Sequence, residues 1–425
     1  MQSLLVSRVL ALDGIRGTAV LMVVASHSVA LLQGGVIGVD LFFVLSGFLI
    51  TSLLLQEHTA TGSIDIGRFY LRRALRLLPA IFPVLILVIG YAAVRQSPEM
   101  LTATLSDARS IIFYYFNWEL ALSHEHYYAH HQPILMHFWS LSVEEQFYLV
   151  WPVLLTGLLW LRVPTAILLA LFVAGIVLPA GARLALYEKG QYWLNFRTDL
   201  RIDDLVWGAF AAWAIYAGWL VPRGWPARVL PWAGLAAGVV LLSIATQEIF
   251  HNGYLMRGLL SVVAFLSALV IVVAARCPPA PLRHALEFAP LRFTGRISYA
   301  LYLWHLPALV IVHNEFPAGG WPYTLGAIAA SFAAATISYY ALERPFLRLK
   351  DRIGYLPIDR PAVHRPMIIA PSQHDSYSRS ISLRGAVIPL TVITHEQDEQ
   401  ACHAAERLVG SATARQPSEA GGPAT

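Results

Sequence analysis

Hydrophobic residues in this chain gather into ten long blocks and do not alternate with polar residues. Each block is about 17–25 residues long, which is the length that a helix needs to cross the hydrocarbon core of a bilayer. The pattern predicts an all-α integral membrane protein with about ten transmembrane helices. The blocks cover residues 17–33, 36–55, 77–94, 138–160, 164–186, 203–220, 229–245, 255–275, 297–316 and 322–343.

Basic residues near the ends of these blocks predict the orientation of the chain. Arg73 and Arg76 precede the third block, and Arg344 and Arg348 follow the last one. Counting ten spans from a cytoplasmic N-terminus places every basic loop in the cytoplasm, as the positive-inside rule requires. Both termini are therefore expected to be cytoplasmic. The short aromatic stretch 109–118 is interpreted as an interfacial or re-entrant segment, because an eleventh crossing would move the later basic loops outside.

Composition divides the chain near residue 350. Residues 1–350 form the predicted membrane domain, whereas 351–425 are rich in Ser, Pro and charged residues and are expected to form a weakly ordered cytoplasmic tail. The chain is 57% hydrophobic and 13% charged, against about 25% charged residues in soluble domains. The net charge of +4 comes from arginines at the ends of apolar blocks, so no nucleic-acid partner is expected. Two distant cysteines give no metal-ligand spacing, and no metal site is predicted.

Ionisable residues inside the predicted spans are candidates for function, because a charge there costs at least roughly 2.5–3.5 kcal/mol on insertion scales. The first span carries Arg16 and His27. Eleven residues return a helix to within about 20° of the same direction and rise about 16 Å. Arg16 is therefore expected at the cytoplasmic mouth, with His27 deeper on the same face. A neutral imidazole can accept a proton from a hydroxyl near pH 7, and a structural role in the helix packing is the alternative.

Two further groups of charged residues stand out. Arg73 and Arg76 share a helix face and could clamp one multi-anionic group; anchoring by the positive-inside rule is the alternative. Glu144 and Glu145 lie about two turns into an apolar helix. Because adjacent helical residues point about 100° apart, one is expected to line a cavity and the other to orient its neighbours. Supporting roles are expected for Asp13, Asp40, Arg201, Asp203 and His305, and an ion pair between Arg201 and Asp203 is one interpretation.

Several motifs occur together in a recognisable order. They include Leu12-Asp13-Gly14-Ile15-Arg16-Gly17 with His27, and Trp139-Ser140-Leu141-Ser142-Val143-Glu144-Glu145-Gln146. The remaining motifs are the segments 38–50, 69–79, 201–203, 297–305 and 342–346. The chain resembles the membrane-bound acyltransferase-3 family over about residues 8–350. Members of this family are bacterial O-acyltransferases that act on O-antigen, exopolysaccharides, peptidoglycan, oligosaccharide signals and macrolides.

The resemblance implies a function and a location. The protein is expected to be a multi-pass enzyme of the bacterial inner membrane that moves an acyl group, most simply acetyl, from cytoplasmic acyl-CoA to a hydroxyl. The acceptor is expected to be a carbohydrate, a glycolipid or a macrolide, and acyl-CoA is a substrate rather than a bound cofactor. Acceptor choice is expected to depend on the outer loops, chiefly 96–137. Its histidines at 124–131 are interpreted as facing substrate rather than binding metal.

The resemblance also implies roles for individual residues. The family's Arg-x10-His pattern falls on Arg16 and His27, and its Arg-x-x-Arg pattern falls on Arg73 and Arg76. His27 is expected to be the general base, with Arg73 and Arg76 binding acyl-CoA. Glu145 is expected to orient His27 or to stabilise its charged form, with Glu144 as the second choice, and Arg16 is expected to belong to the catalytic group with them. Three alternatives remain at this point: a covalent acyl-His27 intermediate, a transporter or flippase that uses the same polar residues, and a non-catalytic sensor.

Overall fold

The computed structural model describes residues 9–28, 30–123, 133–187, 192–220, 225–249, 255–317, 320–352, 380–383 and 386–389. Helices dominate it: α1 (Leu10–Ser28), α2 (Gly38–Thr61), α3 (Ile66–Arg95), α4 (Pro98–Ile112), α5 (Phe116–Ser123), α7 (Phe138–Trp160), α8 (Thr165–Leu186), α9 (Ile202–Tyr216), α10 (Trp225–Ala245), α11 (Leu260–Arg276), α12 (Ala280–Leu286), α13 (Ala289–Arg296), α14 (Ser298–Glu315), α15 (Trp321–Ser338) and α16 (Arg344–Arg352). Strands β1 (Ser380–Leu383) and β2 (Ala386–Pro389) pair antiparallel. The histidine run at 124–131 and most of the predicted tail lie outside the described residues.

The long helices confirm an all-α integral membrane protein. Seven of the described segments are long and apolar enough to cross a bilayer, and the α13–α14 pair, bent by 77°, makes an eighth if it counts as one span. α9 has only 15 residues, and α7 carries two adjacent carboxylates in its first half. The expected ten crossings and two cytoplasmic termini therefore stay predictions.

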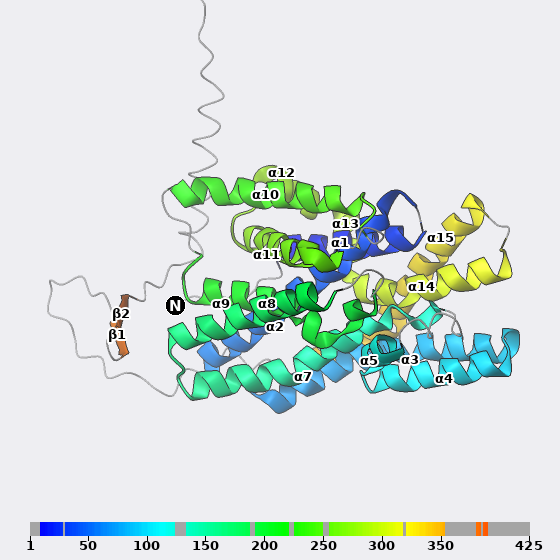
Figure 1. The fold of residues 1–425 in the computed structure, drawn as a ribbon, viewed down its shortest axis with the longest axis horizontal. Coiled ribbons are helices and arrows are strands. Elements are labelled where there is room, and N and C mark those ends of the chain that lie inside the picture. Colours follow the sequence, from blue (N-terminus) through cyan, green and yellow to red (C-terminus); the bar gives the residue numbers. More distant parts are fainter. Residues whose placement is uncertain are drawn as a thin grey trace, which may run out of the picture.

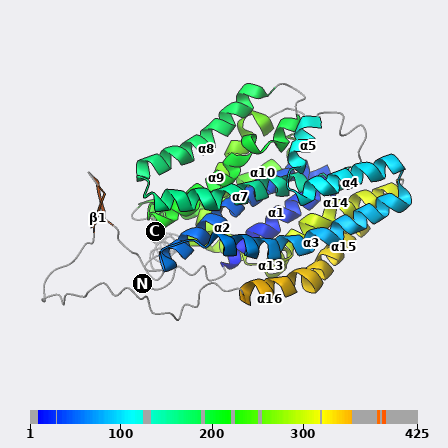
Figure 2. The ribbon, with the colours of Figure 1, turned by 90° about the horizontal axis from the view of Figure 1, so that it is seen from below.

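The long helices form one bundle around a small group of central helices (Figure 1). α10 lies along one edge of this view and α3 with α4 along the opposite edge, while α1, α2 and α9 lie between them. The view turned by 90° places α8 on one side and α16 on the other (Figure 2). Most of the candidate site residues come from the central helices and from α7 and α14, which pack beside them.

Helix ends differ from the block boundaries where the chain turns. The first block was expected to run to residue 33, but α1 ends at Ser28. A short 3-10 segment (Ala30–Ile37) follows, and Leu32 has non-helical backbone angles there. The stretch 109–118 is divided between α4 and α5, with a left-handed turn at Tyr114 (φ 56°). Neither α4 nor α5 is long enough to cross a bilayer, which agrees with a segment that does not cross.

Glycines let the central helices approach backbone to backbone. A Cβ atom on Gly47 of α2 would lie 1.9 Å from the carbonyl oxygen of Leu205, and one on Gly208 of α9 would lie 1.9 Å from that of Val44. Such close crossings by small residues are a usual means of packing membrane helices, where no hydrophobic effect drives association. The α2–α9 crossing brings charged residues of both helices together in the interior.

Candidate active site

A cavity of about 320 Å³ lies between α1, α2, α3, α7 and α14. Arg16, Arg73 and Arg76, which the motif spacings single out, all line it. The lining includes six cationic side chains but only two carboxylates. The cations are Arg16, Arg72, Arg73, Arg76, Arg276 and Lys350, and the carboxylates are Glu57 and Glu144. We call this space the basic cavity; its charge makes it suited to an anionic ligand.

Arg73 is held in place by two side chains of α7. Its Nη2 lies 3.1 Å from Oε1 of Glu145. Its guanidinium carbon lies 3.6 Å from the ring centre of Tyr148, in a cation–π contact. Arg76, one helical turn further along α3, has no hydrogen bond or ion pair to any of the residues that the structure describes. The guanidinium of Arg73 is thus held in place by the protein, whereas that of Arg76 is available to a ligand.

The two adjacent carboxylates of α7 take different partners, as their 100° separation requires. Glu144 lines the basic cavity and accepts hydrogen bonds from the hydroxyls of Ser46 and Tyr148. Glu145 pairs with Arg73. Neither contacts His27, so the expectation that Glu145 orients His27 does not fit this geometry. The physical reason is that an arginine lies within reach of Glu145 and satisfies its charge.

His27 lies in the last turn of α1 and lines a second cavity of about 570 Å³ between α1, α14 and α15. We call this space the histidine cavity. Nδ1 of His27 lies 2.8 Å from the carbonyl oxygen of Val23. Because a carbonyl can only accept, Nδ1 carries the proton, and in the neutral ring Nε2 keeps its lone pair. That is the protonation state a general base needs.

Three histidines and a tyrosine separate the two cavities. The His27 ring centre lies 5.3 Å from that of His305, which in turn lies 5.2 Å from that of His137. The Tyr302 ring, which lines the basic cavity, lies 5.5 Å from His305. The two cavities are thus only a few side chains apart. Arg16 and His27 share a helix face but line different cavities.

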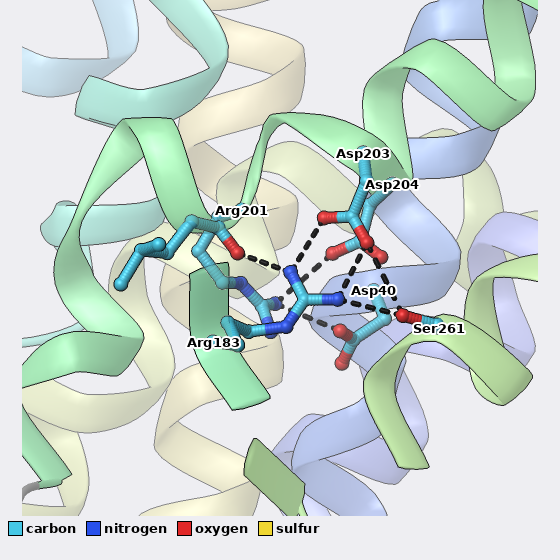
Figure 3. Close-up of polar contacts among 7 residues, drawn as sticks. Asp40, Arg183, Arg201, Asp203, Asp204 and Ser261 are labelled. Carbon is cyan, nitrogen blue, oxygen red and sulfur yellow. Dashed lines mark hydrogen bonds and ion pairs between the residues drawn. The ribbon is translucent and has the colours of Figure 1, made fainter. Parts of the chain in front are cut away.

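A second group of charged residues is sealed inside the bundle (Figure 3). Arg201 lies 2.7 Å from Asp40 and 3.3 Å from Asp204. Arg183 forms two bonds to Asp203, at 2.7 and 2.5 Å. The predicted Arg201–Asp203 pair is therefore wrong, because Arg183 of α8 reaches Asp203 and leaves Arg201 to carboxylates on its other side. We call these five residues the sealed Arg–Asp cluster; none of them lines either cavity.

Comparison with known proteins identifies the family of this chain. Residues 9–343 match a family model described as an acyltransferase domain. The chain belongs to the acyltransferase-3 family. It is 30% identical over 368 residues to an O-acetyltransferase OatA of Staphylococcus aureus, which covers 84% of this chain and 60% of the relative. It is 34% identical over 356 residues to a peptidoglycan O-acetyltransferase OatA of Listeria monocytogenes, covering 81% of this chain and 56% of the relative.

The chain thus spans less than two thirds of the length of these curated relatives. No solved structure matches it. Within the part of the chain that the structure describes, no group of three or more His, Cys, Asp or Glu side chains is arranged to hold a metal ion.

Sequence reasoning did not single out several residues that the structure brings to the candidate site. Tyr302 lies inside the segment 297–305 and His137 lies two positions before the motif that begins at Trp139, but nothing in their spacing gave either of them a role. Tyr148 lies one turn after Glu144 on α7, and that spacing could have indicated their contact. Arg183 lies inside a predicted span, and the cost of a charge there was a signal that could have identified it.

Proposed function

We propose that this acyltransferase moves an acetyl group from acetyl-CoA in the basic cavity to a glycan hydroxyl that enters the histidine cavity. The observation that carries the proposal is the position of His27. It lines the histidine cavity, and the rings of His305 and Tyr302 lie between it and the arginine-rich basic cavity. The donor, the acceptor and a location in the bacterial inner membrane are all parts of the proposal.

The charge of the basic cavity supports acetyl-CoA as the donor. The coenzyme carries a 3′-phosphate, with a charge of about −1.5 to −2 near neutral pH as for other phosphomonoesters, and a pyrophosphate. Guanidinium groups match phosphate oxygens with a planar fork of donors. Arg73 and Arg76 share a face there, and Arg16 faces the same cavity from α1. Ser140 and Tyr302 mark the end nearest the histidines, where the thioester would lie.

The histidine cavity supports a sugar-like acceptor. Phe316 and Tyr323, whose ring centres are 4.8 Å apart, line it together with Asn314 and Thr324. Aromatic faces beside amide and hydroxyl groups are suited to a ligand with both apolar and hydrogen-bonding sides. The name of the Listeria monocytogenes relative indicates a peptidoglycan acceptor, and we extend this to the present chain as part of the proposal.

The reaction follows from these positions. His27 takes the proton of the acceptor hydroxyl at Nε2, the oxygen attacks the thioester carbonyl, and the C–S bond breaks to release CoA. A general base contributes about 10²–10⁴-fold to such a step. His27→Ala should therefore lose at least about 10²-fold in kcat while acetyl-CoA affinity and melting temperature stay near those of the wild type.

The test uses the protein in vesicles with acetyl-labelled acetyl-CoA and a cell-wall glycan. We expect acetyl ester on the glycan with the wild type and a large loss with His27→Ala. Free labelled acetyl groups that cross the bilayer without ester formation would instead establish a transporter. A His27→Ala protein with near-normal transfer would contradict the role of His27, and label that stays on the protein without acceptor would establish a covalent intermediate.

A further inference from the structure

His305 is buried among the ring-bearing side chains that lie between the basic cavity and the histidine cavity. Its side chain has no exposed surface, and its ring lies between those of His27, His137 and Tyr302. His27 opens onto the histidine cavity and Tyr302 onto the basic cavity. His305 is thus the imidazole between the proposed base and the proposed donor.

Hydrogen bonds fix which nitrogen of His305 is free. Its Nδ1 lies 2.6 Å from the carbonyl oxygen of Tyr302 and must carry a proton. Its Nε2 is buried and has no hydrogen-bond partner among the described residues. A buried polar atom without a hydrogen bond destabilises the fold, so such an atom in the interior calls for a functional explanation.

His137 has the same feature on the other side of His305. Its Nε2 lies 3.1 Å from the carbonyl oxygen of Leu303, so Nε2 is the donor. Its Nδ1 is buried without a hydrogen-bond partner in the described part of the chain. The backbone oxygen of His137 accepts a hydrogen bond of 2.9 Å from the Tyr302 hydroxyl. These contacts tie the start of α7 to α14 and hold the His305 ring in place.

Acyl transfer requires a proton to move between the two cavities. The acceptor hydroxyl loses its proton on the side of His27, and the CoA sulfur must gain one on the side of Tyr302. The reaction balances when the O–C bond forms, the C–S bond breaks and this one proton passes from oxygen to sulfur. His27 lines the histidine cavity and not the basic cavity, so a second group is needed to carry the proton from His27 toward the donor.

We propose that His305 is a proton-relay residue between the two cavities, which takes up at Nε2 the proton that His27 removes and passes it on toward the departing CoA thiolate in the basic cavity. His137 acts as a positioning residue for His305. This inference rests on the proposed function and names the path of the proton within it.

The first test replaces His305 with asparagine. The amide nitrogen of Asn can keep the bond to the Tyr302 carbonyl, but Asn offers no basic nitrogen in place of Nε2. We expect kcat to fall by at least about 10²-fold, the lower end for general acid–base catalysis, with KM for acetyl-CoA and melting temperature near those of the wild type. His284→Asn, an exposed histidine of α12 outside both cavities, is the control and should keep wild-type rates.

The second test separates proton transfer from packing. His305→Ala leaves a space that imidazole or pyrazole can fill equally well, but only imidazole is basic enough to take a proton at the working pH. We expect added imidazole to restore part of the lost rate and pyrazole to restore none. Equal rescue by both, or full activity of His305→Asn, would overturn the role of His305. If the wild type itself fails to transfer acetyl from acetyl-CoA, the proposed function fails instead.

Discussion

Two groups of arginines in this protein have opposite surroundings. The arginines of the basic cavity face an open space in which six cationic side chains meet two carboxylates. Arg183 and Arg201 of the sealed Arg–Asp cluster meet three carboxylates and are only 1% and 2% exposed. In the first group the cations outnumber the carboxylates, and in the second group the carboxylates outnumber the cations. The two groups therefore differ in the balance of nearby charge rather than in the presence of arginine, and this balance is what makes the basic cavity, and not the sealed Arg–Asp cluster, suited to an anionic ligand.

The sealed Arg–Asp cluster joins four helices. Asp40 comes from α2, Arg183 from α8, Asp203 and Asp204 from α9, and Arg183 also donates to Ser261 of α11 at 2.7 Å. Removing water from such charges is expensive, and the ion pairs compensate only while both partners are present. The basic cavity lacks that internal compensation, which an anionic ligand would provide.

The largest expected effect breaks one pair of the sealed Arg–Asp cluster. Arg183→Met leaves Asp203 buried with no guanidinium, and loss of one partner of a buried ion pair costs about 3–5 kcal/mol. We expect the purified variant to melt well below the wild type or to fail to accumulate in the membrane. The double variant Arg183→Met/Asp203→Leu removes both charges and should regain most of the stability. Unchanged melting of Arg183→Met would contradict the structural role.

The sequence predicted the helices well because their signal is local. Long apolar blocks fix where a helix must form, and ten such blocks correspond to helices of the structure. The end of α1 was wrong because the turn after it depends on distant contacts: a Cβ on Gly34 would lie 2.4 Å from the carbonyl oxygen of Ile244. Hydropathy averaged over neighbouring residues contains no information on such a backbone contact between distant segments.

The candidate site was predictable only in part, for a related reason. Spacing on one helix places Arg73 and Arg76 on a common face, and the structure puts both in one cavity. Partners from distant segments could not be predicted. Arg201 and Asp40 are 161 positions apart, and Arg73 and Glu145 are 72 apart. Helical periodicity indicates which direction a side chain faces but not which helix lies opposite.

A smaller effect is expected from an unpaired arginine of the basic cavity. Arg76→Ala breaks no hydrogen bond or ion pair among the described residues, although it removes the cation whose charge acts on the buried carboxyl group of Glu343, so the loss of stability should be smaller than for Arg183→Met. A charge-assisted hydrogen bond contributes about 1.5–3 kcal/mol, which corresponds to about a 10–150-fold loss of acetyl-CoA affinity. Binding by calorimetry and melting with and without acetyl-CoA would check this. Arg296→Ala, an exposed arginine of α13 that lines neither cavity, is the matched control; equal losses in both variants would contradict a donor site at Arg76.

The smallest expected effect concerns the shape of a cation rather than its charge. Arg73→Lys keeps the positive charge beside Glu145 but loses the flat guanidinium over Tyr148, and a cation–π contact is worth about 0.5–2 kcal/mol. We expect the free energy of acetyl-CoA binding to become less favourable by that amount and the stability of the protein to change little. In a Tyr148→Leu background the contact is already absent, so the same substitution should cost measurably less, and the cycle of four proteins gives the coupling directly. If the effects of Arg73→Lys and Tyr148→Leu are additive, the Tyr148 ring does not hold Arg73 in place, and the arginine acts in the basic cavity through its charge alone.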